Sequence, residues 1–286
     1  MTQSITETTN SLRRPEHTVL WVLLALSYLA AFAPPGLPGI LGLLIGWLPV
    51  VFALWHFIAW AGWRYAIGGL IIIATVSFFV EALGVATGLV FGNYYYPDGP
   101  LGPLLLGVPP LIQLQYFAMG YGCLMIARSV TSTLNSAARG VTLVVGAIIG
   151  AFGMTMLDLA SDPRQSTQLG MWVWRDDGPF FGVPVHNFVG WFVETLIFFL
   201  LVQWMLTRAS AVKRIEATRP ASFDLMGVLL FGTFPFAIIV RPFALSLNGQ
   251  QATQIEQAMV AVALFAVLPL FVIGVFRWWQ ERAQAI

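Results

Sequence analysis

Long apolar stretches with almost no charged residues constrain the fold of this sequence more than any other feature. A helix needs about 20 apolar residues to cross the hydrocarbon core of a bilayer, and several stretches reach that length. Of all residues, 58% are hydrophobic and 9% are charged, whereas about 25% of the residues of a soluble domain are charged. The sequence therefore predicts an all-α integral membrane protein.

Short polar or Gly/Pro-rich links divide the apolar sequence into eight runs, and we expect each run to form one helix. The predicted spans of this bundle of about eight transmembrane helices are residues 17–33, 40–60, 66–90, 104–127, 141–159, 187–206, 223–245 and 255–276. They form a single transmembrane domain, 17–276, between a polar N-terminal tail, 1–16, and a short cytoplasmic tail, 277–286. No internal repeat of the kind found in many transporters is evident.

The distribution of basic residues predicts the orientation of this bundle. Eight spans place both termini on one side, and 11 of the 14 lysines and arginines fall on that side. Because positive residues concentrate in cytoplasmic loops, we expect both termini to be cytoplasmic in a multi-pass protein of the cell membrane. The three exceptions are Arg164, Arg175 and Arg241.

Several classes of chemistry lack the residues that they need. The single cysteine, Cys123, excludes an internal disulfide, and the three histidines, His17, His56 and His186, show no metal-ligand spacing. No dinucleotide-binding Gly-x-Gly-x-x-Gly or Walker motif is present, nor a serine nucleophile elbow. We therefore expect no metal or redox cofactor, and the basic residues give no support for nucleic-acid binding.

Four acidic residues within or at the end of predicted spans are candidates for catalysis: Glu81, Asp158, Asp162 and Glu194. A charged side chain inside a membrane is costly and is a functional candidate by default. Asp162 follows Asp158 by four residues, so the two share one side of a helix if the helix continues that far. These acids converge on the half of the membrane domain opposite the termini.

Each acid also has a structural interpretation. A buried carboxylate can pair with a buried arginine, and Arg241 is the obvious partner. Asp162-Pro163 can be a helix stop, because proline lacks the donor that a helix needs. Asp176 and Asp177 precede Gly178-Pro179, so turn chemistry is the better interpretation of these two.

Aromatic residues gather in the links on the same side as these acids. Tyr94 and Tyr96 lie in the link 91–103. Trp172 and Trp174 alternate with one valine, so on an extended segment both indoles face the same way. Such rings can form a belt at the membrane interface, line an apolar pocket or stabilise a cation through their faces.

Three stretches together resemble the membrane carotenoid hydratase family, which includes γ-carotene and lycopene 1′,2′-hydratases and bisanhydrobacterioruberin hydratases. They are FGNYYYPDGPLGPLLLGVPPLIQLQYFAMGY (91–121), GMTMLDLASDP (153–163) and WVWRDDGPFFGVPVHNFVGWF (172–192). The residues here that match the family pattern are Tyr94, Tyr96, Asp158, Asp162, Trp172, Trp174, Asn187 and Trp191.

The resemblance implies that water adds to the terminal C1′=C2′ double bond of an acyclic carotenoid end, such as that of γ-carotene or lycopene, and gives a 1′-hydroxy carotenoid. A neutral carboxylic acid protonates the alkene, which leaves a tertiary cation that aromatic faces stabilise. A second carboxylate or an amide then positions and deprotonates the water. No metal or redox cofactor takes part.

Our preferred assignment makes Asp158 the proton donor, with Asp162 or Glu194 holding the water, while Glu81 is the rival donor. In this assignment Trp172, Trp174 and Tyr96 flank the cation. The expected partners are the carotenoid, the lipid bilayer and other enzymes of carotenoid synthesis.

Two other functions compete with this interpretation. Intramembrane acids also form the proton relays of transporters, although a relay would distribute its acids across the whole membrane depth. The chain could alternatively be a non-catalytic scaffold for pigment enzymes, with its acids simply paired.

Overall fold

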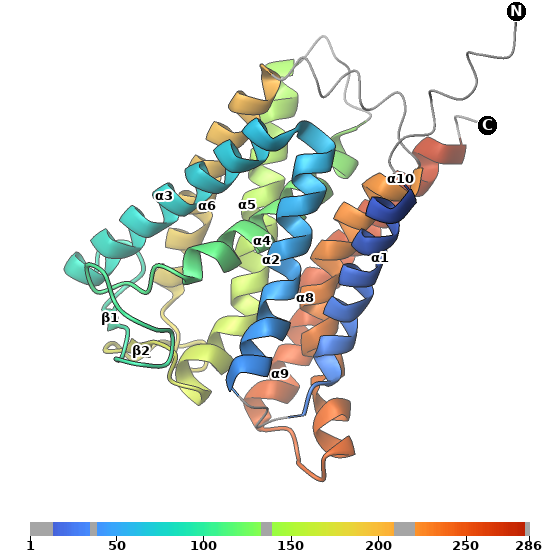
Figure 1. The fold of residues 1–286 in the computed structure, drawn as a ribbon. Helices are drawn as coiled ribbons and strands as arrows, with labels where there is room; N and C mark the ends of the chain where they lie inside the picture. The colour runs from blue at the N-terminus through green and yellow to red at the C-terminus, as the bar shows by residue number, and fades with distance from the viewer. Residues whose placement is uncertain (1–13, 35–38, 133–138, 209–220, 284–286) are drawn as a thin grey trace, which may run out of the picture.

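A computed structural model describes residues 14–34, 39–132, 139–208 and 221–283 of the chain. Almost all of these residues are helical (Figure 1). The helices are α1 Arg14–Leu29, α2 Gly39–Ala61, α3 Trp63–Thr87, α4 Ile112–Thr131, α5 Arg139–Pro163, α6 Val185–Thr207, α8 Ala221–Leu247, α9 Gln254–Val262 and α10 Leu268–Ala283. A short 3₁₀ helix, Ala30–Phe32, extends α1, and π-helical turns, Arg164–Gln168 and Ala263–Val267, follow α5 and α9.

Six helical segments of the described chain are long and apolar enough to cross a membrane, which confirms the predicted all-α membrane fold at that level. They are Leu44–Ala61, Trp63–Thr87, Gly140–Gln168, Val185–Thr207, Ser222–Leu247 and Gln254–Ala283. The other two predicted spans correspond to α1, whose apolar part is shorter, and to α4. The six helices support a membrane protein, whereas an eight-span topology remains an expectation.

The helices run alternately up and down, with α4 near the middle (Figure 1). Helix α4 packs against α3, α5 and α8, and α6 packs against α3 and α5. The start of α1 and the end of α10 lie at one end of the bundle, and the segments between α3 and α4 and between α5 and α6 lie at the other (Figure 1). Helices α3 to α6 thus pack together as one group, and the links between them lie at one end of the bundle.

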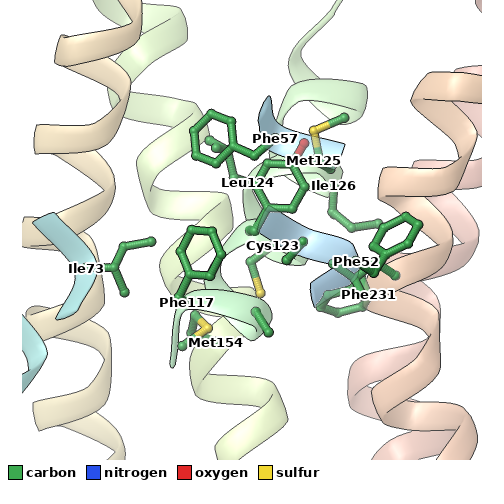
Figure 2. Close-up of a cluster of buried hydrophobic side chains, with 14 of the residues drawn as sticks. Phe52, Phe57, Ile73, Phe117, Cys123, Leu124, Met125, Ile126, Met154 and Phe231 are labelled. Carbon is green, nitrogen blue, oxygen red and sulfur yellow. The ribbon is translucent and has the colours of Figure 1, made fainter. Parts of the chain in front are cut away.

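The core is centred on α4, whose side chains are buried along most of its length. Phe117, Cys123 and Leu124 from α4 meet Phe52 from α2 and Phe231 from α8 (Figure 2). A Cβ atom at Gly122 would lie 3.2 Å from the backbone of Phe231, so this glycine permits the close approach of α4 to α8. Small residues at such contacts are a usual means of packing helices in membranes.

The fourth helix begins later than the sequence predicts. Helix α4 starts at Ile112 instead of residue 104, and the preceding residues form tight turns, one of them closed by Leu105 and Val108. Pro109 and Pro110 lack backbone donors, and the residue before a proline is disfavoured in the helical region. These prolines therefore delay the helix.

The expected helix stop at Asp162-Pro163 is wrong. Pro163 has helical dihedral angles, φ −54° and ψ −36°, and the chain continues into the π-helical turn Arg164–Gln168. Proline removes only its own donor, and the wider turn that follows accommodates the change in hydrogen bonding. Because the helix continues, Asp158 and Asp162 lie one turn apart on the same side.

A two-stranded ribbon closes the end of the α3–α6 group. Strand β1, Tyr94–Tyr95, pairs antiparallel with β2, Val173–Trp174, with Tyr94 opposite Trp174. Beside it, Asp176 Oδ2 accepts hydrogen bonds from the backbone N and the Nδ2 of Asn93, at 3.2 and 2.7 Å. Asp176 thus joins the two links that the ribbon also joins.

Candidate active site

A small cavity lies beneath this ribbon, enclosed by α3, α4, α5 and α6. Its lining residues are Glu81, Phe91, Tyr94, Tyr96, Ile112, Tyr116, Asp162, Trp172, Trp174, Asn187 and Trp191. The empty space amounts to about 280 Å³, part of it open to the outside. Its enclosed part has room for about two water molecules. The cavity therefore combines carboxylates, aromatic rings and space for water.

Glu81, from the last third of α3, is held entirely by tyrosine hydroxyl groups. Tyr116 donates to Oε1 at 2.6 Å, whereas Tyr96 donates to Oε2 at 3.1 Å and Tyr94 donates to the same oxygen. Burial, and next the Glu81 carboxyl, raise the pKa of Tyr94 and Tyr96 well above the usual range of tyrosine. Both residues therefore keep their hydroxyl protons.

Asp158 and Asp162 are joined by one amide group. The Nδ2 of Asn187 donates to Asp158 Oδ2 and to Asp162 Oδ2, each at 2.8 Å. The second oxygen of Asp162 accepts a hydrogen bond from Nε1 of Trp172 at 3.0 Å. Because α5 extends as far as Pro163, Asp162 lies within the helix, one turn after Asp158.

Aromatic rings form the walls of the cavity in three pairs. Tyr116 stacks on Trp191 with centroids 4.7 Å apart and planes at 12°. The other two pairs cross between the links, Tyr94 against Trp174 at 5.1 Å and Tyr96 against Trp172 at 6.2 Å. Their faces give the cavity a low polarity while leaving it attractive to positive charge.

Glu194 and Asp158 lie behind the cavity and do not line it. Both side chains are buried. Neither carboxylate oxygen of Glu194 has a hydrogen-bond partner among the described residues. Of the four predicted acids, Glu81 and Asp162 are therefore the two that face the enclosed space.

Arg241 is not the partner of these acids, contrary to the structural interpretation drawn from the sequence. Its Nε donates to Oε1 of Glu256 at 3.1 Å, and the Nε of Arg164 donates to the same oxygen at 3.1 Å. The other oxygen of Glu256 accepts from the backbone N of Thr253 in a capping box that begins α9. The arginines thus join α5, α8 and α9 outside the cavity.

The structure brings the predicted site residues into one cluster, because eight of the ten line the cavity and the other two, Asp158 and Glu194, adjoin it. Sequence reasoning missed Tyr116, Phe91 and Ile112. Tyr116 lies within the stretch 91–121 that carries the family resemblance, and this was a usable signal. Its role was not evident, since a tyrosine in an apolar helix is also an ordinary core residue.

Fold and site together define an integral membrane protein with a buried acidic and aromatic cavity near one end of its helical bundle. The model of the carotenoid biosynthesis protein family matches residues 38–268, most of the chain. The chain therefore belongs to that family.

One relative is the bisanhydrobacterioruberin hydratase of Haloarcula japonica, which is 28% identical over 165 residues, or 57% of this chain. The match spans 54% of the relative's length. No solved structure matches the chain. Among the described residues, no group of three or more histidines, cysteines and acids is arranged to hold a metal ion.

Proposed function

We propose that this protein is a membrane hydratase that adds water to the terminal C1′=C2′ double bond of an acyclic carotenoid end and gives a tertiary alcohol. Membership of the carotenoid biosynthesis family and the hydratase name of the relative support the reaction class. The observation that carries the proposal is the enclosed cavity in which two carboxyl groups face aromatic walls and a space for water.

Hydration of an isolated alkene needs an acid that can transfer a proton to carbon. Transfer of H⁺ to C2′ breaks the π bond and leaves a tertiary cation at C1′. Water then forms a bond to C1′, and its extra proton passes to a base, so the net change is the addition of one H₂O. General acid and general base groups contribute about 10²- to 10⁴-fold each to such steps.

The surroundings of the cavity suit the cationic intermediate. The stacked Tyr116 and Trp191 line the cavity together with Trp172 and Trp174. Aromatic faces stabilise a nearby cation by about 0.5–2 kcal/mol each, more where water is excluded. Such surroundings suit a cation that water then captures.

The donor role in this proposal moves from Asp158 to an acid that lines the cavity. Asp158 lies behind Asn187, whereas Glu81 and Asp162 line the cavity. Asp158 then acts on the reaction only through Asn187 and Asp162.

We also propose that the cavity lies toward the non-cytoplasmic side of the cell membrane, with both termini cytoplasmic. Arg64 lies at the start of α3, Arg128 in the last turn of α4 and Arg139 at the start of α5, so all three are at the helix ends away from the cavity. Concentration of positive charge at that end is typical of cytoplasmic loops. The carotenoid end would enter the cavity while the rest of the polyene stays in the bilayer.

The test is direct. The full chain, purified in detergent, is incubated with lycopene or γ-carotene in water enriched in ¹⁸O, and the pigments are analysed by mass spectrometry. We expect a product that has gained one water with the heavy oxygen. The matched control, Asp98→Asn, changes an exposed acid of the neighbouring loop and should retain activity. Unchanged pigment with both carotenes, from folded protein, would contradict the proposal.

A further inference from the structure

The two helical hairpins that enclose the cavity, α3 with α4 and α5 with α6, share a sequence pattern in their links. Asp-Gly-Pro occurs at 98–100 and again at 177–179. Gly-Val-Pro occurs at 107–109 and at 182–184, in each case just before the second helix of the hairpin. The two links do not align as one continuous repeat, because the spacing between the two tripeptides differs between the hairpins.

The backbone repeats at the same place. Leu106 and Phe181, which precede the two Gly-Val-Pro tripeptides, have φ of 52° and 51° and are the non-glycine residues with positive φ in the described chain. The glycines after them, Gly107 and Gly182, have φ of 80° and 87°. Bulky residues rarely adopt this conformation, so its occurrence at equivalent points marks two copies of one turn.

Equivalent positions also meet across the cavity. Tyr116 and Trp191 are each the ninth residue after the glycine of the repeated tripeptide, and their rings stack. Strand β1 pairs antiparallel with β2, α3 packs against α6, and α5 packs against α4. Reciprocal contacts of this kind are those of two units related by an approximate twofold axis, which here passes through the cavity.

Each half contributes acid from its first helix, but the donors that hold the acids differ. In the first half, Glu81 receives its hydrogen bonds from three tyrosine hydroxyls. In the second half, Asp162 receives them from the indole of Trp172 and the amide of Asn187. The two halves therefore present chemically different carboxyl groups to one space.

This difference sets what each carboxyl group can do. A hydroxyl can donate or accept a hydrogen bond, so the tyrosines can turn and accept from a protonated Glu81. An indole N–H and an amide NH₂ can only donate. A proton on either oxygen of Asp162 would therefore meet a donor and displace one of these hydrogen bonds, which favours Asp162 as the acceptor.

A second observation concerns Trp174, whose ring also lines the cavity. Its buried Nε1 lies close to the Asp162 carboxylate, although the two groups make no hydrogen bond of full geometry. This indole is therefore a further donor-only group beside Asp162. A water molecule in the cavity beside them can donate to the Asp162 carboxylate.

We propose that the two halves of this duplicated unit divide the reaction, the tyrosine-held Glu81 delivering the proton and Asp162 holding the water. This inference rests on the proposed hydratase function. Glu81 gives H⁺ to C2′ and becomes a carboxylate, while water bonds to C1′ and its proton passes to the Asp162 carboxylate. Proton return from Asp162 to Glu81 through solvent restores both groups.

Deuterium exchange separates the two roles. Wild type, Glu81→Gln and Asp162→Asn are incubated with the acyclic carotene in D₂O, and mass spectrometry follows both the alcohol and the recovered alkene. Glu81→Gln should form no cation, so neither alcohol nor deuterated alkene appears. Asp162→Asn should still form the cation, which loses a proton back to Glu81, so deuterium enters the alkene while alcohol formation falls at least about 100-fold.

Two milder substitutions repeat the test without changing any charge. Tyr116→Phe removes one donor from the first half, and Trp172→Phe removes one from the second, each with a ring retained. We expect Tyr116→Phe to slow alcohol formation and exchange in equal proportion, by about tenfold. Trp172→Phe should slow alcohol formation more than exchange.

The outcomes distinguish this inference from the proposed function. The division of roles is overturned if deuterium enters the alkene with Glu81→Gln, or if folded Asp162→Asn shows no exchange. In either case the hydratase proposal still stands as long as the wild type hydrates the carotene. A folded wild type that gives neither alcohol nor exchange overturns the hydratase proposal itself. Equal effects of Tyr116→Phe and Trp172→Phe on alcohol and exchange would also contradict the division.

Discussion

The protein holds two kinds of buried acid near the same end of its bundle, and they have different surroundings. Glu256 is paired with two arginines and closes a helix cap, so its charge is compensated in place. Glu81 and Asp162 have only neutral donors, and both line the cavity. Full ionic pairing suits an acid that fixes helices, whereas neutral donors leave an acid free to exchange a proton.

The second difference between the two sites is their connection to the fold. Glu256 links α9 to α5 through Arg164 and to α8 through Arg241. The acids of the cavity also bridge elements, but through hydroxyl, indole and amide groups that carry no charge. We therefore expect charge removal to reduce stability at Glu256 and to reduce activity at the cavity.

The largest effect should come from Glu81→Gln. The amide keeps an oxygen that can accept from the tyrosines, so the fold should persist, but it has no proton to give. We expect alcohol formation to fall by about 10²- to 10⁴-fold, with little change in the unfolding temperature. Product yield and thermal unfolding in detergent measure the two quantities. A variant with near-normal activity would place the donor elsewhere.

The reverse pattern is expected for Glu256→Gln. Loss of the carboxylate leaves Arg164 and Arg241 facing each other without compensation, which should lower the free energy of unfolding by about 2–4 kcal/mol. We expect less than the full cost of breaking a buried ion pair, because about a quarter of each arginine side chain is exposed. Activity measured well below the unfolding temperature should change less than threefold. Strong loss of activity in a stable variant would contradict the difference between Glu256 and the acids of the cavity.

A smaller effect on activity is expected for Tyr96→Phe. Tyr96 makes the longest of the three hydrogen bonds to Glu81, 3.1 Å, and the ring that faces Trp172 remains. One lost hydrogen bond corresponds to about three- to tenfold in rate. Kinetics at saturating carotene would measure it, with Tyr95→Phe as the matched control, because Tyr95 points away from the cavity on the same strand. Equal loss in both variants would argue for a general effect on the ribbon.

The smallest effect should follow Arg164→Lys. Lysine keeps the charge near Glu256 but not the planar guanidinium that donates through Nε. We expect a loss of about 1 kcal/mol in stability and no change in the product. Thermal unfolding at low and high salt would report it. A loss as large as that of Glu256→Gln would mean that Arg164 carries most of the interaction.

Much of this arrangement could be predicted from the amino-acid sequence. Apolar runs located the helices, with α6 found within two residues of its observed bounds. The cost of charge in a membrane singled out Glu81, Asp158, Asp162 and Glu194. The resemblance supplied Asn187 and the aromatic positions, and all of them gather around one cavity.

Other features were beyond the sequence because they depend on contacts between distant segments. The partner of Arg241 could not be chosen from sequence, since Glu256 and the four site acids are all compatible with it in charge. The continuation of α5 through Pro163 depends on a π-helical turn that no local preference indicates. The internal duplication became visible only where the stacked Tyr116 and Trp191 placed equivalent positions face to face.

By itself, the sequence determined that this chain is a helical membrane protein and that its acids and aromatic rings gather toward one side, because hydropathy and the cost of buried charge act on each segment separately. The tertiary structure decided which acid faces the cavity and which donors hold it. Those properties depend on how α3, α4, α5 and α6 pack together. This packing gives Glu81 hydroxyl donors and gives Asp162 indole and amide donors.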